Sequence, residues 1–110
     1  MKMNEYQELS ARTANGHDNE RANFALGLTG EAGEVADNIK KEQFHGHEPN
    51  PDEIEKELGD VLWYLSQIAR VYDLKLEDIA ERNINKLKKR FPEGFDKEAS
   101  KNREEYQSED

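Results

Sequence analysis

The chain has 110 residues, of which 34% are hydrophobic and 37% are charged, and its formal net charge is −9. A chain of this length forms one domain, and a partner subunit would help to bury its surface. The negative charge argues against nonspecific binding to nucleic acid or to an anionic membrane. The chain has no cysteine, which excludes disulfides and thiolate metal sites. Without a signal peptide or an apolar run of membrane length, we expect a cytoplasmic protein.

The first residues predict a short amphipathic helix, because Met3, Tyr6 and Leu9 recur on one helical face. We expect this helix to end near Thr13, before a turn-rich segment at residues 15–19.

A long second helix is expected from about residue 20 to residue 43. Its apolar stripe consists of Leu28, Ala32, Val35 and Ile39. Glu31 and Glu34 project from one flank of this stripe. Glycine inside a helix costs roughly 1 kcal/mol relative to alanine. We therefore expect another helix or a ligand to approach Gly30 and Gly33 closely.

The third helix is expected over residues 51–71, after a loop containing His45 and His47 that lacks the further ligands a zinc site needs. Asn50 can cap this helix, and Glu53 can close a capping box. Its apolar stripe consists of Ile54, Leu58, Val61, Leu62, Leu65, Ala69 and Tyr72.

A second acid pair lies on the flank of the third helix, where Glu57 and Asp60 repeat the spacing of Glu31 and Glu34. If the two helices pack antiparallel, four carboxylates converge. Anions share a pocket only when they are protonated or when they bind cations. Oxygen ligands without cysteine or histidine suit Mg²⁺, with Mn²⁺ as a possible substitute.

A fourth helix is expected over residues 76–90, and Asn83 lies inside its apolar stripe with Lys86 and Arg90 on one flank. Two interpretations of Asn83 stay open at this point: a hydrogen bond between helices, or a ligand contact beside two phosphate-binding cations. The composition changes after residue 92. We expect a helical domain over 1–92 and a charged tail or strap over 93–110.

Three segments together resemble the MazG-like, all-α nucleoside triphosphate pyrophosphohydrolases. They are GLTGEAGEVAD at residues 27–37, ELGDVLWY at residues 57–64 and NINKLKKRFP at residues 83–92. Many members of the family carry E-E-x-x-E where this chain has Gly30 in the first position, as the branch similar to dCTP pyrophosphatases also does.

The resemblance implies an all-α bundle of four or five helices, assembled as a homodimer or homotetramer. It also implies Mg²⁺-dependent hydrolysis of a (deoxy)nucleoside triphosphate to the monophosphate and pyrophosphate, by attack of metal-activated water on the α-phosphorus. The implied catalytic and metal-binding residues are Glu31, Glu34, Glu57 and Asp60. The candidates for substrate binding are Lys41, Tyr64, Asn83, Lys86 and Arg90. For Tyr64, plain packing is an equal alternative to stacking on the sugar or the base.

Trp63 projects away from the predicted stripe of its helix, and an exposed tryptophan predicts an interface between subunits. Two other functional classes remain open. A carboxylate-bridged di-metal bundle of other chemistry would use Glu-x-x-His motifs, which the predicted helices lack. A non-catalytic helical oligomerisation or interaction module could share the same periodicities, but it would not explain two acid pairs beside apolar stripes.

Overall fold

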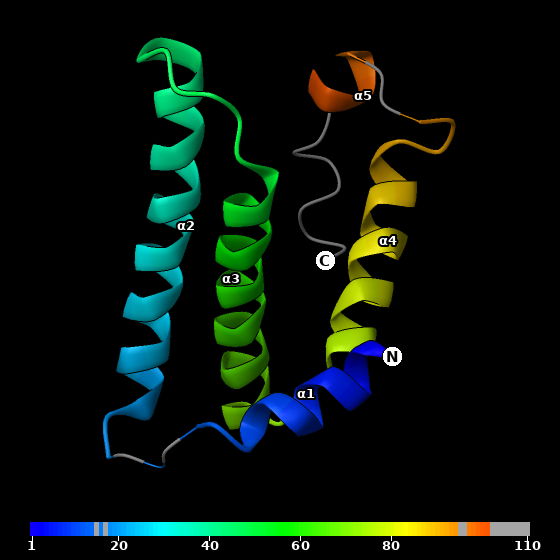
Figure 1. Cartoon of the computed structure of the whole chain (residues 1–110). Coiled ribbons are helices and arrows are strands. Elements are labelled where there is room, and N and C mark those ends of the chain that lie inside the picture. Colours follow the sequence, from blue (N-terminus) through cyan, green and yellow to red (C-terminus); the bar gives the residue numbers. More distant parts are fainter. Residues whose placement is uncertain (15, 17, 95–96, 102–110) are drawn as a thin grey trace. The chain divides into compact units, whose positions relative to one another are not determined.

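The computed structural model describes residues 1–14, 16, 18–94 and 97–101. Within these ranges the chain forms α1 (Met3–Ala11), α2 (Glu20–Phe44), α3 (Pro51–Val71), α4 (Leu76–Arg90) and α5 (Lys97–Lys101), and no strand (Figure 1). The all-α prediction is confirmed. No helix in the described part is long and apolar enough to cross a membrane. The chain divides into two compact units, residues 1–75 and residues 76–110, which are described separately.

In the first unit, α2 and α3 lie side by side, and α1 packs against α3 (Figure 1). The loop between α2 and α3 is tied to both helices. The backbone N–H groups of His45 and His47 donate to the Lys41 carbonyl at 3.0 and 3.2 Å, and Gly46 supplies a positive φ of 72°. This anchoring returns the chain directly into α3, so that the two long helices run antiparallel.

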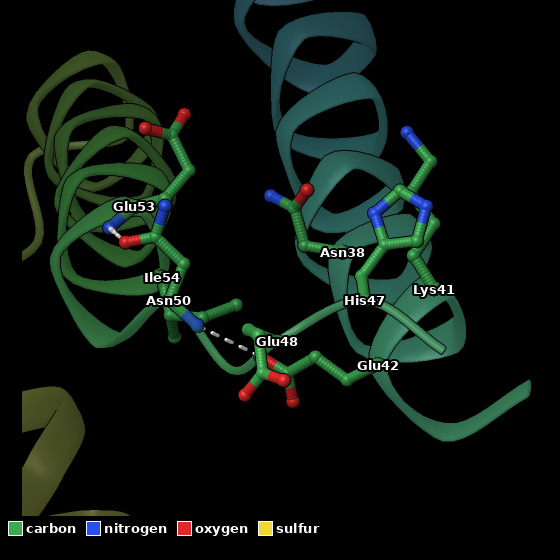
Figure 2. Close-up of a pocket in the computed structure, with 8 residues that line it drawn as sticks. All are labelled: Asn38, Lys41, Glu42, His47, Glu48, Asn50, Glu53 and Ile54. Atoms are coloured by element: carbon green, nitrogen blue, oxygen red, sulfur yellow. Dashed lines mark hydrogen bonds between the residues drawn. The ribbon is translucent and has the colours of Figure 1, made fainter. Parts of the chain in front are cut away.

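The start of α3 follows the sequence prediction in one respect and departs from it in another. The Asn50 side chain accepts a hydrogen bond from the Glu53 backbone N–H at 3.2 Å, as expected for a cap (Figure 2). The Asn50 backbone N–H donates to the Glu42 carboxylate at 3.3 Å. In a capping box, the Glu53 side chain would accept the hydrogen bond from the Asn50 backbone N–H. Here the Glu42 carboxylate accepts it instead.

The face of α2 that packs against α3 differs from the predicted stripe. The buried and half-buried positions recur as Glu20, Phe24, Leu28, Glu31, Val35, Asn38 and Glu42. The predicted stripe members Ala32 and Ile39 are exposed. Phe24 has far more apolar area to bury than Ala32. The rotation of α2 about its own axis that places Phe24 on the inward face therefore leaves Ala32 exposed. As a result Glu31 lies between the two helices and not on their flank.

Trp63 corrects a second prediction, because it does not project away from the core. Its ring packs edge-on against Phe24 and Tyr64, with centroid distances of 5.8 and 5.0 Å. Its indole N–H donates to the Thr13 hydroxyl at 2.9 Å. The single stripe predicted for α3 assumed one neighbouring helix, whereas α1 covers a second face of α3.

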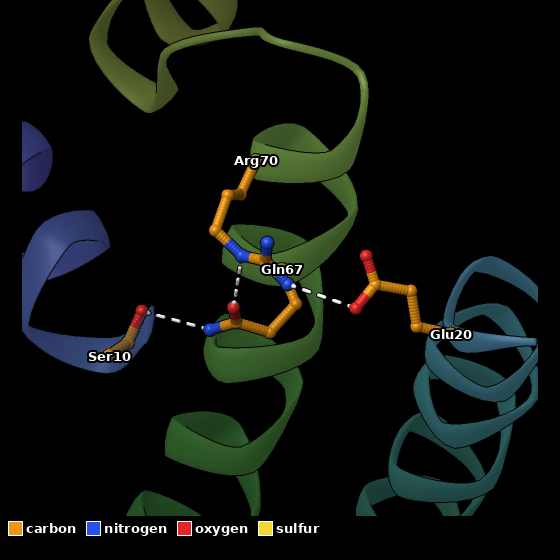
Figure 3. A network of polar contacts seen from close by, with 4 residues as sticks. All are labelled: Ser10, Glu20, Gln67 and Arg70. Carbon is orange, nitrogen blue, oxygen red and sulfur yellow. Dashed lines mark hydrogen bonds and ion pairs between the residues drawn. The ribbon is translucent and has the colours of Figure 1, made fainter. Parts of the chain in front are cut away.

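A hydrogen-bonded network joins the first three helices (Figure 3). Gln67, which is 0% exposed, donates to the Ser10 hydroxyl at 3.0 Å and accepts from the Arg70 Nε at 3.1 Å. Arg70 also forms an ion pair with Glu20 at 3.5 Å. Since buried polar groups are stable only when paired, this network fixes how α1 docks. Ser10 is the buried residue of α1, while Met3 and Leu9 of the predicted face are exposed.

In the second unit, α4 has the predicted bounds. Acids in its first turn and bases in its last turn complement the helix dipole. Beyond the helix, Gly94 adopts a φ of 93°. The predicted tail contains α5, and residues 102–110 lie outside the described residues. The tail or strap therefore stays a prediction.

Candidate active site

Three acidic side chains meet between the two long helices of the first unit. Glu31 comes from α2, and Glu57 and Asp60 come from successive turns of α3. One carboxylate oxygen from each of the three lies within 4.8 Å of the others. We call these three residues the acid cluster. Their spacing allows one cation to contact all three side chains after small rotamer adjustments.

Glu34 is the fourth acid that the sequence singles out, and it lies outside the acid cluster. It sits one turn beyond Glu31 on α2, where it is exposed. Its charge still reaches Glu57, because Glu34 is among the groups that raise the pKa of that residue. Its part in binding a metal stays a prediction.

The electrostatics of the acid cluster favour a cation. The pKa of Glu57 is raised to about 7, chiefly because its carboxyl group shares a hydrogen bond with Glu31. Partial burial adds to this shift, and so does repulsion from Glu31, Glu34 and Glu53. A bound divalent cation would replace the shared proton and cancel the repulsion. A donor set made only of oxygen fits Mg²⁺ or Mn²⁺.

The Tyr64 ring packs against Gly27, one turn away from the acid cluster on both helices. Tyr64 lies one turn after Asp60, and Gly27 lies one turn before Glu31. A Cβ atom built on Gly27 would lie 2.8 Å from Cδ1 of Tyr64 and nearer still to two other ring atoms. This close approach was not predicted from the sequence. A helix-interior glycine one turn before an acid on the inward face was the available signal.

Gly30 and Gly33, for which the sequence predicted a close approach, have open surroundings. A Cβ atom built on Gly30 or Gly33 meets no described atom within 4 Å. The chain itself therefore supplies no close contact at either position, and the expectation of an approaching helix is wrong for the described part of this chain. Approach by a ligand stays a prediction.

We expect Gly27→Ala to weaken Mg²⁺ or Mn²⁺ binding and to lower the free energy of unfolding by about 1–3 kcal/mol. The added methyl group must displace the Tyr64 ring, which pushes Asp60 away from Glu31. Titration calorimetry and thermal melts measure the two effects. Gly33→Ala is the matched control, since its methyl group enters open space and should stabilise the helix by up to about 1 kcal/mol. Unchanged metal affinity in Gly27→Ala would contradict this role for the glycine.

Tyr6 on α1 is a further residue that sequence reasoning did not select for the site. Burial raises its pKa, and the negative charge of Asp60 adds to the shift. Tyr6 is therefore within electrostatic range of the acid cluster, so α1 contributes to the surroundings of the site as well as to the fold.

Lys41 lies beyond the acid cluster, toward the end of α2. Its ammonium group forms an ion pair with Asp37 at 3.0 Å, and the hydrogen bond from Lys41 holds the pKa of Asp37 below its ordinary value. Lys41 also lines a pocket with Asn38 and Glu53 (Figure 2). The structure thus places Lys41 beside Asp37 and at the loop-end pocket, and its contact with a substrate stays a prediction.

Asn83, Lys86 and Arg90 lie on α4, in the second unit. Their spacing of three and four residues puts them on one side of that helix. Whether they contact a substrate bound at the acid cluster stays a prediction.

A comparison with protein families now bears on this arrangement. The model described as the MazG nucleotide pyrophosphohydrolase domain matches residues 19–95, a range that contains α2, α3 and α4 with every predicted site residue. The chain belongs to the MazG family. The resemblance noted in the sequence is thereby confirmed, and with it the all-α MazG-like fold.

A relative of this MazG-family chain is the Gene 37 protein of Mycobacterium phage L5. The two are 40% identical over 82 residues, which is 71% of this chain and 72% of the phage protein. No solved structure matches the chain. Membership of the MazG family supports nucleotide pyrophosphohydrolase activity in general, and enzymes of this family generally depend on a divalent metal.

Proposed function

We propose that this MazG-family chain hydrolyses a (deoxy)nucleoside triphosphate to the monophosphate and pyrophosphate with Mg²⁺ as its cofactor. The observation that carries the proposal is the acid cluster, in which oxygens of Glu31, Glu57 and Asp60 lie within 4.8 Å of one another. Such a cluster on a helix pair is held rigidly, as a metal site requires. Mn²⁺ would substitute for Mg²⁺ in the same oxygen site.

Different residues of the chain are proposed to bind the metal and the phosphates of the substrate. Glu31, Glu57 and Asp60 would hold the metal, with Glu34 adding negative charge beside them. When bound, the metal supplies a water of lowered pKa and neutralises charge on the phosphates. Lys86 and Arg90 are proposed to bind the pyrophosphate end.

The roles proposed for two other residues follow from their contacts. The Tyr64 ring packs against Gly27 and Trp63, which supports the packing role over stacking on a nucleotide. Lys41 already forms an ion pair with Asp37. A phosphate that contacts Lys41 would therefore meet a lysine whose charge is partly balanced by Asp37.

The test is pyrophosphate release from a panel of nucleoside and deoxynucleoside triphosphates, with Mg²⁺ and with excess chelator. We expect release of pyrophosphate, and not of orthophosphate, that depends on the metal. The assay also decides between this enzyme and the two alternatives, a di-metal bundle of other chemistry and a non-catalytic helical module. Absence of pyrophosphate release from every nucleotide tested would contradict the proposal.

We further propose that the chain is a homodimer or homotetramer, because it leaves large apolar side chains uncovered. Leu58 and Leu65 are 51% and 43% exposed, and their seven-residue spacing places them along one line of α3. Tyr72, the C-cap of α3, continues this line with 56% exposure, and the Arg21 guanidinium lies 4.8 Å from its ring centroid. An uncovered apolar line on a small domain indicates an interface. This line replaces Trp63 as the interface candidate, since Trp63 packs within its own chain.

Leu65→Glu should dissociate the oligomer in sedimentation velocity, because a charge buried at an interface without a partner costs several kcal/mol. Leu26→Glu is the control, since Leu26 is an exposed leucine on α2. An oligomer that Leu65→Glu leaves intact would place the interface elsewhere. Trp63→Glu should instead destabilise the monomer, which loses the contacts of Trp63 with Phe24 and Thr13.

A further inference from the structure

A pocket of about 140 Å³ lies at the loop end of α2 and α3 (Figure 2). It is lined by Asn38, Lys41 and Glu42 of α2, by His47, Glu48 and Asn50 of the loop, and by Glu53 and Ile54 of α3. The anchored loop gives the pocket a fixed floor, because the His47 backbone is tied to Lys41 and the Asn50 backbone to Glu42.

The pocket lies on the same pair of helices as the acid cluster. Glu53 lies one turn before Glu57 and is close enough to affect its ionisation. Asn38 lies seven residues after Glu31, which is about 10 Å along a helix axis. An elongated ligand with its phosphates at the acid cluster can therefore extend its other end into this pocket.

Two polar side chains from opposite helices border the pocket. The Asn38 amide is directed from α2 toward α3, and the Glu53 side chain rises from the first turn of α3 on the side of α2 (Figure 2). Neither side chain has a hydrogen-bond partner within the described part of the chain. The Asn50 backbone N–H, which would donate to the Glu53 carboxylate in a capping box, donates to Glu42. An amide both donates and accepts, whereas an ionised carboxylate only accepts.

We propose that this pocket binds the nucleobase of the substrate, and that Glu53 selects bases that present an amino group. The inference rests on the proposed function and adds a specificity-determining residue to it. The carboxylate of Glu53 would accept from the amino group, and Asn38 would pair with the neighbouring ring atoms.

The chemistry of the bases sets the expected selectivity. Cytosine and adenine offer an exocyclic amino group, and guanine offers an amino group beside a ring N–H. Uracil and thymine instead place carbonyl oxygens on both sides of their single ring N–H. A carbonyl oxygen facing Glu53 leaves two acceptors in contact without a hydrogen between them, which disfavours these bases. Contacts of this kind change base preference by about ten- to a hundredfold.

The sharpest test compares dCTP with dUTP, which differ on one edge of the base: position 4 carries an amino group or a carbonyl oxygen, and N3 is an acceptor in cytosine and an N–H donor in uracil. For the unaltered protein we expect kcat/KM for dCTP to exceed that for dUTP by at least about tenfold. Glu53→Gln should bring the ratio close to one, because the glutamine amide can donate to the uracil oxygen.

The ratio is the informative quantity, since Glu53→Gln also removes a charge near Glu57. Any resulting change in metal affinity acts equally on both nucleotides and cancels in the ratio. Glu55→Gln is the matched control, because it makes the same change of charge at an exposed position two residues further along α3. It should leave the ratio unaltered. Asn38→Ala provides a second variant, which should lower kcat/KM for both nucleotides without restoring dUTP.

Each outcome bears on the inference. A ratio above ten that collapses in Glu53→Gln and persists in Glu55→Gln supports it. Hydrolysis of both nucleotides with the same ratio in the unaltered protein and in Glu53→Gln overturns it, while the proposed function stands. Absence of hydrolysis of any nucleoside triphosphate by the unaltered protein overturns the proposed function itself, and the inference with it.

Discussion

Asp60→Ala should reduce Mg²⁺-dependent pyrophosphate release by at least about a hundredfold. Asp60 contributes one of the three oxygens that lie within 4.8 Å of one another, and its removal leaves too few ligands to hold a cation and orient a water. Steady-state kinetics on the preferred triphosphate would measure the loss of activity. Calorimetric titration with Mn²⁺ would show whether metal binding is lost in parallel.

The same variant should keep its helices and gain thermal stability in the absence of metal, because removing one carboxylate relieves repulsion within the acid cluster. Circular dichroism and thermal melts in chelator would show both effects. Glu55→Ala is the matched control on the same helix and should change neither activity nor metal affinity. Undiminished activity in Asp60→Ala would remove Asp60 from the metal site.

Glu34→Ala belongs to the same experiment and tests the fourth acid. The sequence predicts that Glu34 is a ligand, while the structure places it outside the acid cluster. If Glu34 joins the site when metal binds, Glu34→Ala should match Asp60→Ala in its loss of activity. A much smaller loss would restrict the metal ligands to the three clustered acids.

Arg90→Ala and Lys86→Ala should each weaken substrate binding or transition-state stabilisation by about 2–4 kcal/mol, the range for a charge-assisted contact in a dry site. Both side chains lie on one side of α4 and bring positive charge without any acid among them. Their proposed target is therefore the phosphate chain and not the ion. Steady-state kinetics on both variants, together with Mn²⁺ titration of the nucleotide-free protein, separates the two roles.

Metal affinity without nucleotide should stay nearly constant in these variants. Lys88→Ala is the matched control, because residue 88 points to the opposite side of α4 from residue 86. It removes the same charge from the same helix and should leave the kinetics unchanged. Loss of metal binding in Arg90→Ala with normal nucleotide affinity would reverse the assignment. If Lys86→Ala and Lys88→Ala have the same kinetics, Lys86 is an ordinary surface charge with no role in substrate binding.

Much of the fold could be predicted from local signals in the sequence. Asn50 and Pro51 marked the start of α3 because capping is decided within a few residues. The twin spacing of the acids predicted their convergence, since antiparallel helices bring such pairs together. Signals of this kind depend only on residues that are close together in the sequence, so they can be recognised without the structure.

The faces of the helices were harder to predict, because a face depends on what packs against it. Ala32 fits a periodic apolar stripe, yet the larger Phe24 decides how α2 turns. Trp63 looked exposed only because nothing in its own helix shows that α1 covers a second side of α3. Gly27 could not be linked to Tyr64 without knowing which turns of the two helices meet. In each case the missing information was a contact between distant segments.

The hydrogen-bonded network around Gln67 also bears on how this chain can change during evolution. An apolar contact between helices tolerates replacement of one member by another of similar size, so such positions drift independently. Gln67 is paired on both sides, with Ser10 and with Arg70. A leucine at position 67 would remove one hydrogen bond from each of these partners, leaving Ser10 with Gln7 and Ser66 and leaving Arg70 with Glu20. Substitutions at these three positions should therefore occur together across relatives of this chain.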